Sequence, residues 1–173
     1  MIDCAQFYSL LKENNTDFFA GVPDSLLKNF CAYITDKLPE SNHVITPNEG
    51  SAIALATGYH LATGKYPLVY MQNSGLGNTV NPLLSLASPE VYSIPMILLI
   101  GWRGEPGIHD EPQHISQGKL TLPLLDTMQI PYSILSDQQD RLAEQLQECY
   151  TYLEKNNAPY AIVIRKNTFQ DYC

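Results

Sequence analysis

The chain has 173 residues and a mass of 19.4 kDa, which is the size of one domain and enough to bury a hydrophobic core. Its content of 45% hydrophobic and 16% charged residues excludes a disordered chain, and 18 acidic against 10 basic residues exclude a general electrostatic binder of nucleic acid. No apolar run reaches the length of a membrane span, and residues 1–15 lack the basic and apolar regions of a secretory signal.

Patterns typical of helices and strands alternate along the chain. In chain order we expect helix 3–15, strand 18–20, helix 25–37, strand 44–46, helix 48–63, strand 68–71, helix 77–87, strand 96–100, helix 115–128, strand 132–135, helix 137–156 and strand 161–164. Asp3 and Asp137 are expected N-caps. Pro82 and Pro123 are expected to interrupt or bend the helices that contain them.

This alternation predicts one α/β domain over residues 1–173. Short apolar strands that take turns with helices are typical of a doubly wound, mostly parallel six-stranded sheet with helices on both faces. Ligands of such sheets bind beyond the carboxyl ends of the strands, where the strand order reverses. The loops 21–25, 46–50, 72–78 and 101–114 follow predicted strands and are therefore the candidate site.

The four cysteines are scattered and form no CxxC pair. We expect reduced thiols in a cytoplasmic protein, and neither a disulfide framework nor a zinc site. The residues concerned are Cys4, Cys31, Cys149 and Cys173.

Two acidic residues, Glu49 and Asp24, stand at strand-to-helix turns, and the sequence allows two roles for each. Thr46 fits a helix N-cap, Pro47 the first helical position, and Glu49 the glutamate of a capping box. Alternatively, Glu49 points from the start of the helix into a ligand cleft. Asp24 is either an N-cap, a role that Ser25 can also fill, or a group in the same cleft.

The loop 72–78 contains two glycines in a Gly-x-Gly pattern. Val80 occupies the position of the third glycine of a dinucleotide fingerprint, and no GxxxxGK[ST] motif occurs, so dinucleotide binding and P-loop chemistry are both disfavoured. A turn that presents backbone amides to a ligand or partner fits the loop better.

The loop 101–114 concentrates the polar groups that carry chemistry. It holds the only tryptophan, an arginine, two histidines and three carboxylates after a strongly apolar strand. Three interpretations remain open: a solvated loop, a metal site, or a substrate-facing loop in which His109 or His114 carries a proton.

Together these loops resemble a known family. The segments GVPDSLLKNF, TPNEGSAIALATGYHLATGK, YMQNSGLGNTVNPLLSLASPEVYSIPMILLIGWRGEPG and DEPQH are similar to the pyrimidine-binding domain of thiamine-diphosphate-dependent 2-oxo acid decarboxylases. The resemblance covers nearly the whole chain. Within the family, it is strongest to the branch that decarboxylates phosphonopyruvate to phosphonoacetaldehyde and carbon dioxide, and next to the branch that acts on sulfopyruvate with a separate pyrimidine-binding subunit.

The resemblance implies roles for individual residues. Glu49, the glutamate of the NEG motif, contacts the aminopyrimidine ring of thiamine diphosphate and shares a proton with a ring nitrogen. By position, Asp24 and His114 act as catalytic groups near the substrate. Arg103 or Lys119 is a candidate to meet its anionic end, although no motif assigns that task. The remaining substrate positions are Ser25, His109 and Gln113, and the remaining cofactor positions are Gln72, Asn73, Ser74 and Gly75.

The resemblance also implies a missing partner. The family holds the cofactor diphosphate through Mg²⁺, bound by a GDG…N motif in a second domain, and this sequence contains no GDG. We therefore expect no metal ligands here, a diphosphate-binding domain or subunit supplied from elsewhere, and a homo-oligomer that is nearly inactive without it. A local basic pocket, supplied partly by the other domain, would bind the anionic substrate. The alternative is a non-catalytic binding or regulatory module on the same scaffold.

Overall fold

Six parallel strands form one sheet in the order β2-β1-β3-β4-β6-β5 in the computed structural model, which describes residues 1–172. Every pairing between neighbouring strands is parallel, which confirms the expected doubly wound sheet. Cys173 lies outside the described residues. The strands are β1 (Phe19–Gly21), β2 (His43–Ile45), β3 (Leu68–Gln72), β4 (Ile97–Gly101), β5 (Tyr132–Ile134) and β6 (Tyr160–Ile164).

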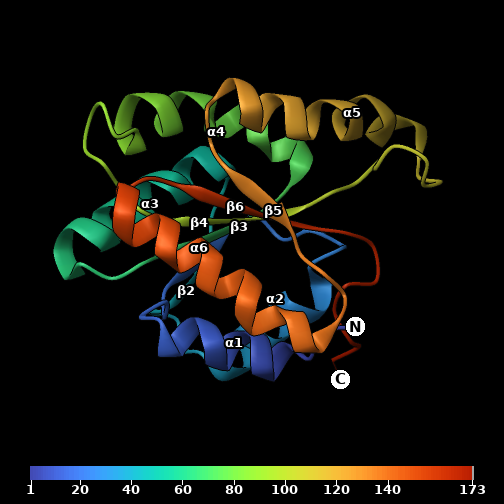
Figure 1. Ribbon diagram of the computed structural model, residues 1–173, viewed down its shortest axis with the longest axis horizontal. Coiled ribbons are helices and arrows are strands. Elements are labelled where there is room, and N and C mark those ends of the chain that lie inside the picture. Colours follow the sequence, from blue (N-terminus) through green and yellow to red (C-terminus); the bar gives the residue numbers. More distant parts are fainter. Residues whose placement is uncertain (173) are drawn as a thin grey trace.

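Helices cover both faces of this sheet (Figure 1). One face carries α1 (Cys4–Glu13), α2 (Lys28–Lys37) and α6 (Leu142–Asn156), and the other carries α3 (Glu49–Thr63), α4 (Leu76–Pro82) and α5 (Pro112–Thr127). The two hydrophobic clusters draw on alternate residues of β3, with Leu68 and Tyr70 on one side and Val69 and Met71 on the other. This alternation is what a strand buried on both faces requires.

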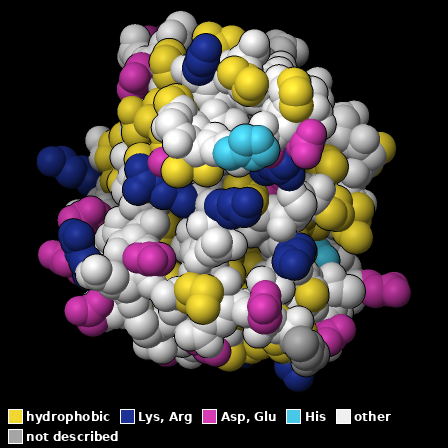
Figure 2. Space-filling view, turned by 90° about the vertical axis from the view of Figure 1, so that its right-hand side faces the viewer, with side chains coloured by type: hydrophobic (Ala, Val, Ile, Leu, Met, Phe, Trp, Pro, Cys, Tyr) yellow, Lys and Arg dark blue, Asp and Glu magenta, His cyan; other side chains and the backbone are white. Residues whose placement is uncertain are grey.

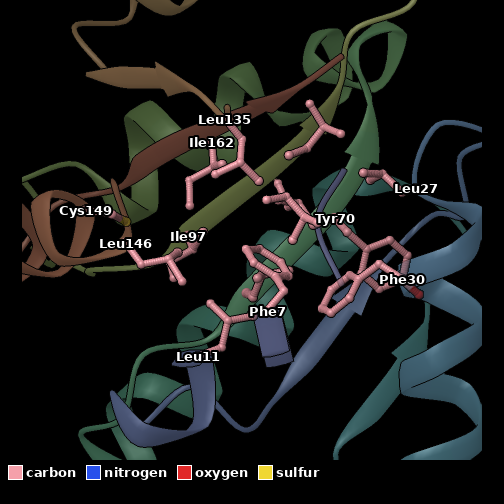
Figure 3. Packing of buried hydrophobic residues seen from close by; sticks show 14 of the residues in the cluster. Phe7, Leu11, Leu27, Phe30, Tyr70, Ile97, Leu135, Leu146, Cys149 and Ile162 are labelled. Carbon is pink, nitrogen blue, oxygen red and sulfur yellow. The ribbon is translucent and has the colours of Figure 1, made fainter. Parts of the chain in front are cut away.

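Aromatic rings pack among Leu and Ile side chains in the cluster under α1 and α2 (Figure 3). The Phe7 and Phe30 rings meet edge to face with centroids 5.0 Å apart, and Phe169 stacks on Phe30 at 5.6 Å. The backbone of Phe169 also forms a parallel bridge with the backbone of Ile2. The two ends of the described chain are therefore fixed to each other at the carboxyl edge of the sheet.

Several helix boundaries differ from the sequence prediction. Residues 25–27 form a turn, so α2 begins at Lys28. The predicted helix 77–87 divides into α4 and a π-helical turn η2 (Leu83–Ala87), because Pro82 cannot donate a backbone hydrogen bond, and a 3-10 turn η1 (Asn73–Gly75) precedes α4. Asp137 is not an N-cap: a 3-10 turn η3 (Gln139–Arg141) precedes α6.

The strand order reverses between β1 and β3. The chain runs from β1 outward to β2 and then returns to the other side of β1, so the crevice at the carboxyl ends of β1 and β3 is a topological switch point. The loops after β1 and β3 and the start of α3 all lie at this edge. The fold therefore brings together the loops that the sequence marked as candidates.

Candidate functional site

Glu49 does not cap the start of α3. Asn48 is the N-cap, and its side chain accepts a hydrogen bond from the Ser51 amide at 2.9 Å. Thr46 donates its hydroxyl proton to the Asn48 carbonyl oxygen at 2.9 Å. The predicted N-cap at Thr46 and capping-box role of Glu49 are therefore wrong. Glu49 occupies the first position of the helix, where the unpaired amides and the helix dipole favour a negative charge.

The carboxylate of Glu49 is buried at the carboxyl edge, with 8% of the residue exposed. Its Oε2 accepts a hydrogen bond from the Asn78 side-chain amide at 2.7 Å. Its other side lies against Gly75, where a Cβ atom would be 2.3 Å from Oε1. No hydrogen bond within residues 1–172 ends at Oε1. One carboxylate oxygen is thus fixed by the chain, and the other has no hydrogen-bond partner among the described residues.

Asp24 is the second buried carboxylate at this edge, with 5% exposed. Its Oδ2 accepts from the Leu26 amide at 2.9 Å, whereas its buried Oδ1 has no hydrogen-bond partner. Gly101 packs against it so closely that a Cβ atom there would lie 2.1 Å from Oδ2. Asp24 caps the turn before α2 and not the helix itself, since the helix N-cap is Leu27.

Burial controls the protonation of Asp24. Loss of solvation raises the pKa of its carboxyl group, and the amides of Leu26 and Leu27 and the charge of Arg103 offset only part of that effect. A carboxyl group with a raised pKa and an unpartnered oxygen, held at a topological switch point, is a candidate for proton transfer.

Arg103 joins the loop after β1 to the loop after β4. Its Nε and Nη2 donate to the two Asp110 oxygens at 2.8 and 2.5 Å, and Nη1 donates to the Ser25 hydroxyl oxygen at 2.7 Å. The Gly104 amide also donates to Asp110, at 2.8 Å. The Arg103 guanidinium holds the pKa of Asp110 well below its usual range. This bidentate pair gives the long loop a defined shape.

Asn73 ties the loop after β3 to the same structure. Its buried side-chain amide donates to the Arg103 carbonyl oxygen and to the Thr121 hydroxyl oxygen, both at 2.8 Å, and its Oδ1 accepts from the Arg103 amide at 3.2 Å. The side chain predicted to contact the cofactor is therefore engaged within the chain, which makes it a positioning group.

The other predicted positions are spread along the same edge. Gln72 donates to the Ser74 hydroxyl oxygen at 2.6 Å, and Ser74 is exposed beside the buried Gly75. His114 is half-buried in the first turn of α5, and Gln113 is exposed. His109 is exposed and lines a cavity, so the two histidines do not share one environment.

The structure adds residues that sequence reasoning missed. Asn78 stands at the end of the QNSGLGN segment, and only the fold shows that it meets Glu49. Asp110 was one of several acidic residues in a charged loop, and no sequence signal paired it with Arg103.

Residues 1–172 contain neither a cluster of metal-ligating side chains nor a membrane-spanning helix. No three side chains of His, Cys, Asp or Glu gather as a metal site would require. No described helix has both the length and the apolar composition needed to cross a membrane.

The chain belongs to the class of doubly wound α/β domains, whose ligands bind at the switch point, and here that point carries a buried carboxylate. Residues 5–130 match the family described as thiamine pyrophosphate enzyme, N-terminal TPP binding domain. The chain belongs to this family, which confirms the family that its motifs resemble.

Proteins named as decarboxylases are similar to this chain in sequence. The chain is 33% identical to phosphonopyruvate decarboxylase of Streptomyces viridochromogenes over 177 residues, which cover 99% of this chain and 42% of that protein. It is 35% identical to sulfopyruvate decarboxylase subunit alpha of Methanococcus maripaludis over 125 residues, or 72% of each chain. The chain thus spans less than half the length of the Streptomyces enzyme.

Solved structures share the fold. The thiamine diphosphate-dependent 4-hydroxybenzoylformate decarboxylase of Rhodococcus jostii RHA1 matches with a TM-score of 0.69 and 21% identity, over 98% of this chain and 31% of that one. The 2-oxoglutarate:ferredoxin oxidoreductase of Magnetococcus marinus matches with a TM-score of 0.71 and 16% identity, over 97% of this chain and 29% of that one.

Proposed function

We propose that the chain is the pyrimidine-binding half of a thiamine-diphosphate-dependent decarboxylase that converts phosphonopyruvate to phosphonoacetaldehyde and carbon dioxide. The observation that carries the proposal is Glu49: a buried carboxylate at a helix start, held by Asn78 on one oxygen and unbonded on the other. The identity to phosphonopyruvate decarboxylase over nearly the whole chain supports the substrate.

The residues at this edge fit an aminopyrimidine ring. The unbonded Oε1 of Glu49 suits a ring nitrogen that shares a proton, and the surface beside it is the side-chain-free Gly75. When bound, the cofactor would supply an electron sink for the electron pair that stays on the substrate carbon as carbon dioxide leaves. Glu49 holds a proton at the ring nitrogen, and Asp24 is placed to exchange a proton with the substrate. Asn73 and Arg103 position the loops around them.

The proposal includes a partner. A diphosphate-binding domain or subunit would supply the Mg²⁺ site and close the cofactor cleft, and the assembly would be a homo-oligomer or contain two kinds of chain. The length of the Streptomyces relative, of which this chain spans 42%, supports this division of labour. Because the described cysteines are free thiols and two of them are buried, we also propose a reducing, cytoplasmic setting.

A second candidate function is the alpha subunit of a sulfopyruvate decarboxylase. It is favoured by one observation, the match over 72% of both this chain and the Methanococcus subunit. Competition between phosphonopyruvate and sulfopyruvate in one assay separates the two, because the true substrate has the higher kcat/KM.

The decisive experiment is Glu49→Gln in the complete enzyme, that is, this chain together with its diphosphate-binding domain. Wild-type enzyme is expected to release carbon dioxide from phosphonopyruvate, and the variant is expected to fold normally and lose about 100-fold or more in kcat. Near-normal turnover in the variant would remove Glu49 from the mechanism. A wild-type assembly inactive with every 2-oxo acid would favour a non-catalytic module.

A further inference from the structure

A cavity of about 360 Å³ opens at the carboxyl edge of the sheet, next to the candidate site. Its walls are the first turn of α2, the loop after β4 and the segment after β6. It shares the loop after β1 with the candidate site, because Ser25 lines it and the neighbouring Asp24 belongs to the site. The side chains that can donate hydrogen bonds into it are Ser25, Lys28, Asn29, Arg103, His109 and Lys166.

Basic groups gather at this cavity although the chain carries a net charge of -8. Lys28, Arg103 and Lys166 come from three separate segments and all line it. Figure 2 views the molecule from the side on which the chain ends lie, and shows Lys and Arg side chains grouped near the middle of this face beside a histidine. In an acidic protein, such a grouping indicates a local site for an anion.

Carboxylates also line the cavity, but each has a partner. Asp110 is bound by Arg103, Glu105 accepts from Arg165 at 2.8 Å, and Asp171 accepts from the Asn29 amide at 3.3 Å. The two lysines differ: within residues 1–172, neither Lys28 nor Lys166 has a carboxylate oxygen within 4.0 Å. Neither lysine is therefore ion-paired within the described chain, and these two positive charges outnumber the one carboxylate of the cavity, Asp171, whose partner is a neutral amide.

The start of α2 adds backbone donors. Its N-cap, Leu27, makes no side-chain hydrogen bond, and its first turn contains no acidic residue. Lys28 and Asn29, the first two residues of this ten-residue helix, line the cavity. An uncapped helix start presents free amides and the positive end of the dipole, both of which favour an anion.

We propose that this cavity, named here the Lys28–Lys166 cavity, binds the phosphonate or sulfonate end of the substrate, an inference that rests on the proposed function. Lys28 and Lys166 supply the charges, and Ser25 and Asn29 supply neutral donors. A negatively charged tetrahedral group with three acceptor oxygens engages several such donors, whereas the methyl group of pyruvate engages none. The cavity is thus the specificity determinant for small 2-oxo acids with an anionic tail.

The first test measures anion binding to the 173-residue chain without activity. Methylphosphonate, methanesulfonate, inorganic phosphate and acetate are titrated while amide shifts are followed by NMR. Methylphosphonate is expected to shift amides at the start of α2, and Lys28→Ala and Lys166→Ala are each expected to weaken its binding about tenfold. The matched control is Lys12→Ala, an exposed lysine on α1 away from the cavity. Unsaturable binding, or equal affinity in both lysine variants and wild type, overturns the proposal.

The second test uses the complete enzyme. Lys28→Ala and Lys166→Ala are expected to raise the KM for phosphonopyruvate about tenfold and to leave the KM for pyruvate unchanged. An unchanged KM for phosphonopyruvate, together with tight binding of inorganic phosphate, would mean that the cavity holds free phosphate, and would overturn the proposal.

The two proposals fail separately. If Lys28→Ala changes neither binding nor KM while Glu49→Gln abolishes turnover, the cavity assignment is wrong and the proposed function stands. If no assembly decarboxylates any 2-oxo acid, the proposed function is wrong, and with it the cavity's assignment to a substrate.

Discussion

The carboxylate of Glu49 rests directly on Gly75, so that a methyl group at position 75 would lie 2.3 Å from Oε1 and 2.4 Å from Cδ. The backbone of Gly75, with φ −73° and ψ −15°, has a conformation that any residue adopts. The glycine is therefore required by the neighbouring side chain and not by the chain path. Glu49 of helix α3 and Gly75 of turn η1, which are more than twenty residues apart in sequence, define this contact together.

The first prediction follows from that contact. Gly75→Ala is expected to displace the Glu49 carboxylate and to lower kcat of the complete enzyme by about 100-fold, the cost of a misplacement near 1 Å. Thermal unfolding should change much less, because the Glu49 side chain can rotate away. The matched control is Gly77→Ala, since a Cβ atom at Gly77 meets nothing within 4 Å. A Gly75→Ala enzyme as active as Gly77→Ala would contradict the assigned contact.

The fold was predictable because the sequence repeats one pattern. Apolar strands such as 96–100, bounded by helices, predict a parallel sheet that helices cover on both faces, and the structure confirms this sheet. The first residue of a helix was harder to predict where several nearby polar side chains can cap the same backbone amides. At the start of α3, the sequence suggested Thr46 as the N-cap and Glu49 as its capping-box partner, whereas the N-cap in the packed structure is Asn48.

The site was only partly predictable, because its parts come from distant segments. Asp24 and Glu49 follow strands and were found by that rule. Asn78 was not, because its role depends on the angle at which α4 meets α3. Lys28 and Lys166 carry no sequence signal either, since the cavity between them exists only when the segments after β1 and β6 are brought side by side.

Asn78 supplies the second prediction. It is exposed, and its only side-chain hydrogen bond within residues 1–172 goes to Glu49. Asn78→Ala is expected to leave the free energy of unfolding nearly unchanged and to lower kcat about tenfold, the value of one hydrogen bond to a charged group. Asn78→Asp should cost more, because it places a second negative charge beside the carboxylate.

The control for this prediction is Asn81→Ala, one turn further along α4. The Asn81 side chain is exposed and accepts only from the Ser85 hydroxyl, so its loss should leave kcat unchanged. Wild-type kcat in both Asn78 variants would show that Glu49 does not depend on this bond.

A close approach between Gly104 and Gly118 supplies the third prediction. A Cβ atom at Gly118 would lie 1.7 Å from the Gly104 carbonyl oxygen, and the Trp102 indole donates to the Gly118 carbonyl oxygen at 2.8 Å. Because backbone atoms cannot move aside, Gly118→Ala is expected to cost about 1–3 kcal/mol of stability and to detach the loop after β4 from α5.

Urea unfolding and the fluorescence of Trp102, the only tryptophan, measure both effects. Gly118→Ala should lower the unfolding midpoint and shift the native emission to the red as the indole becomes wetter. Gly58→Ala, on α3 with nothing within 4 Å, should instead raise stability by about 0.5–1 kcal/mol. Native emission identical to wild type in Gly118→Ala would show that the contact does not hold the loop.

The pH dependence of stability tests the buried carboxylate of Asp24. Because burial raises its pKa in the folded chain, the folded state binds more protons than the unfolded state between the unfolded pKa, about 3.9, and the raised value. Stability therefore falls as pH rises through that window, since the charged form is the disfavoured one. Asp24→Asn does not titrate. Its stability relative to wild type should increase from about pH 4 upward and level off above the raised pKa.

The measurement is the free energy of unfolding of wild type and Asp24→Asn across this pH range. The same substitution in the complete enzyme is expected to lower kcat about 100-fold or more, because an amide cannot exchange a proton with the substrate. An Asp24→Asn variant that is more stable and less active than wild type is the outcome expected if the buried carboxylate lowers stability but is needed for catalysis. A difference in stability that is flat with pH, or that shrinks as pH rises, would mean that Asp24 is ionised in the folded chain as readily as in water, and the proton-exchange role would then have no physical basis.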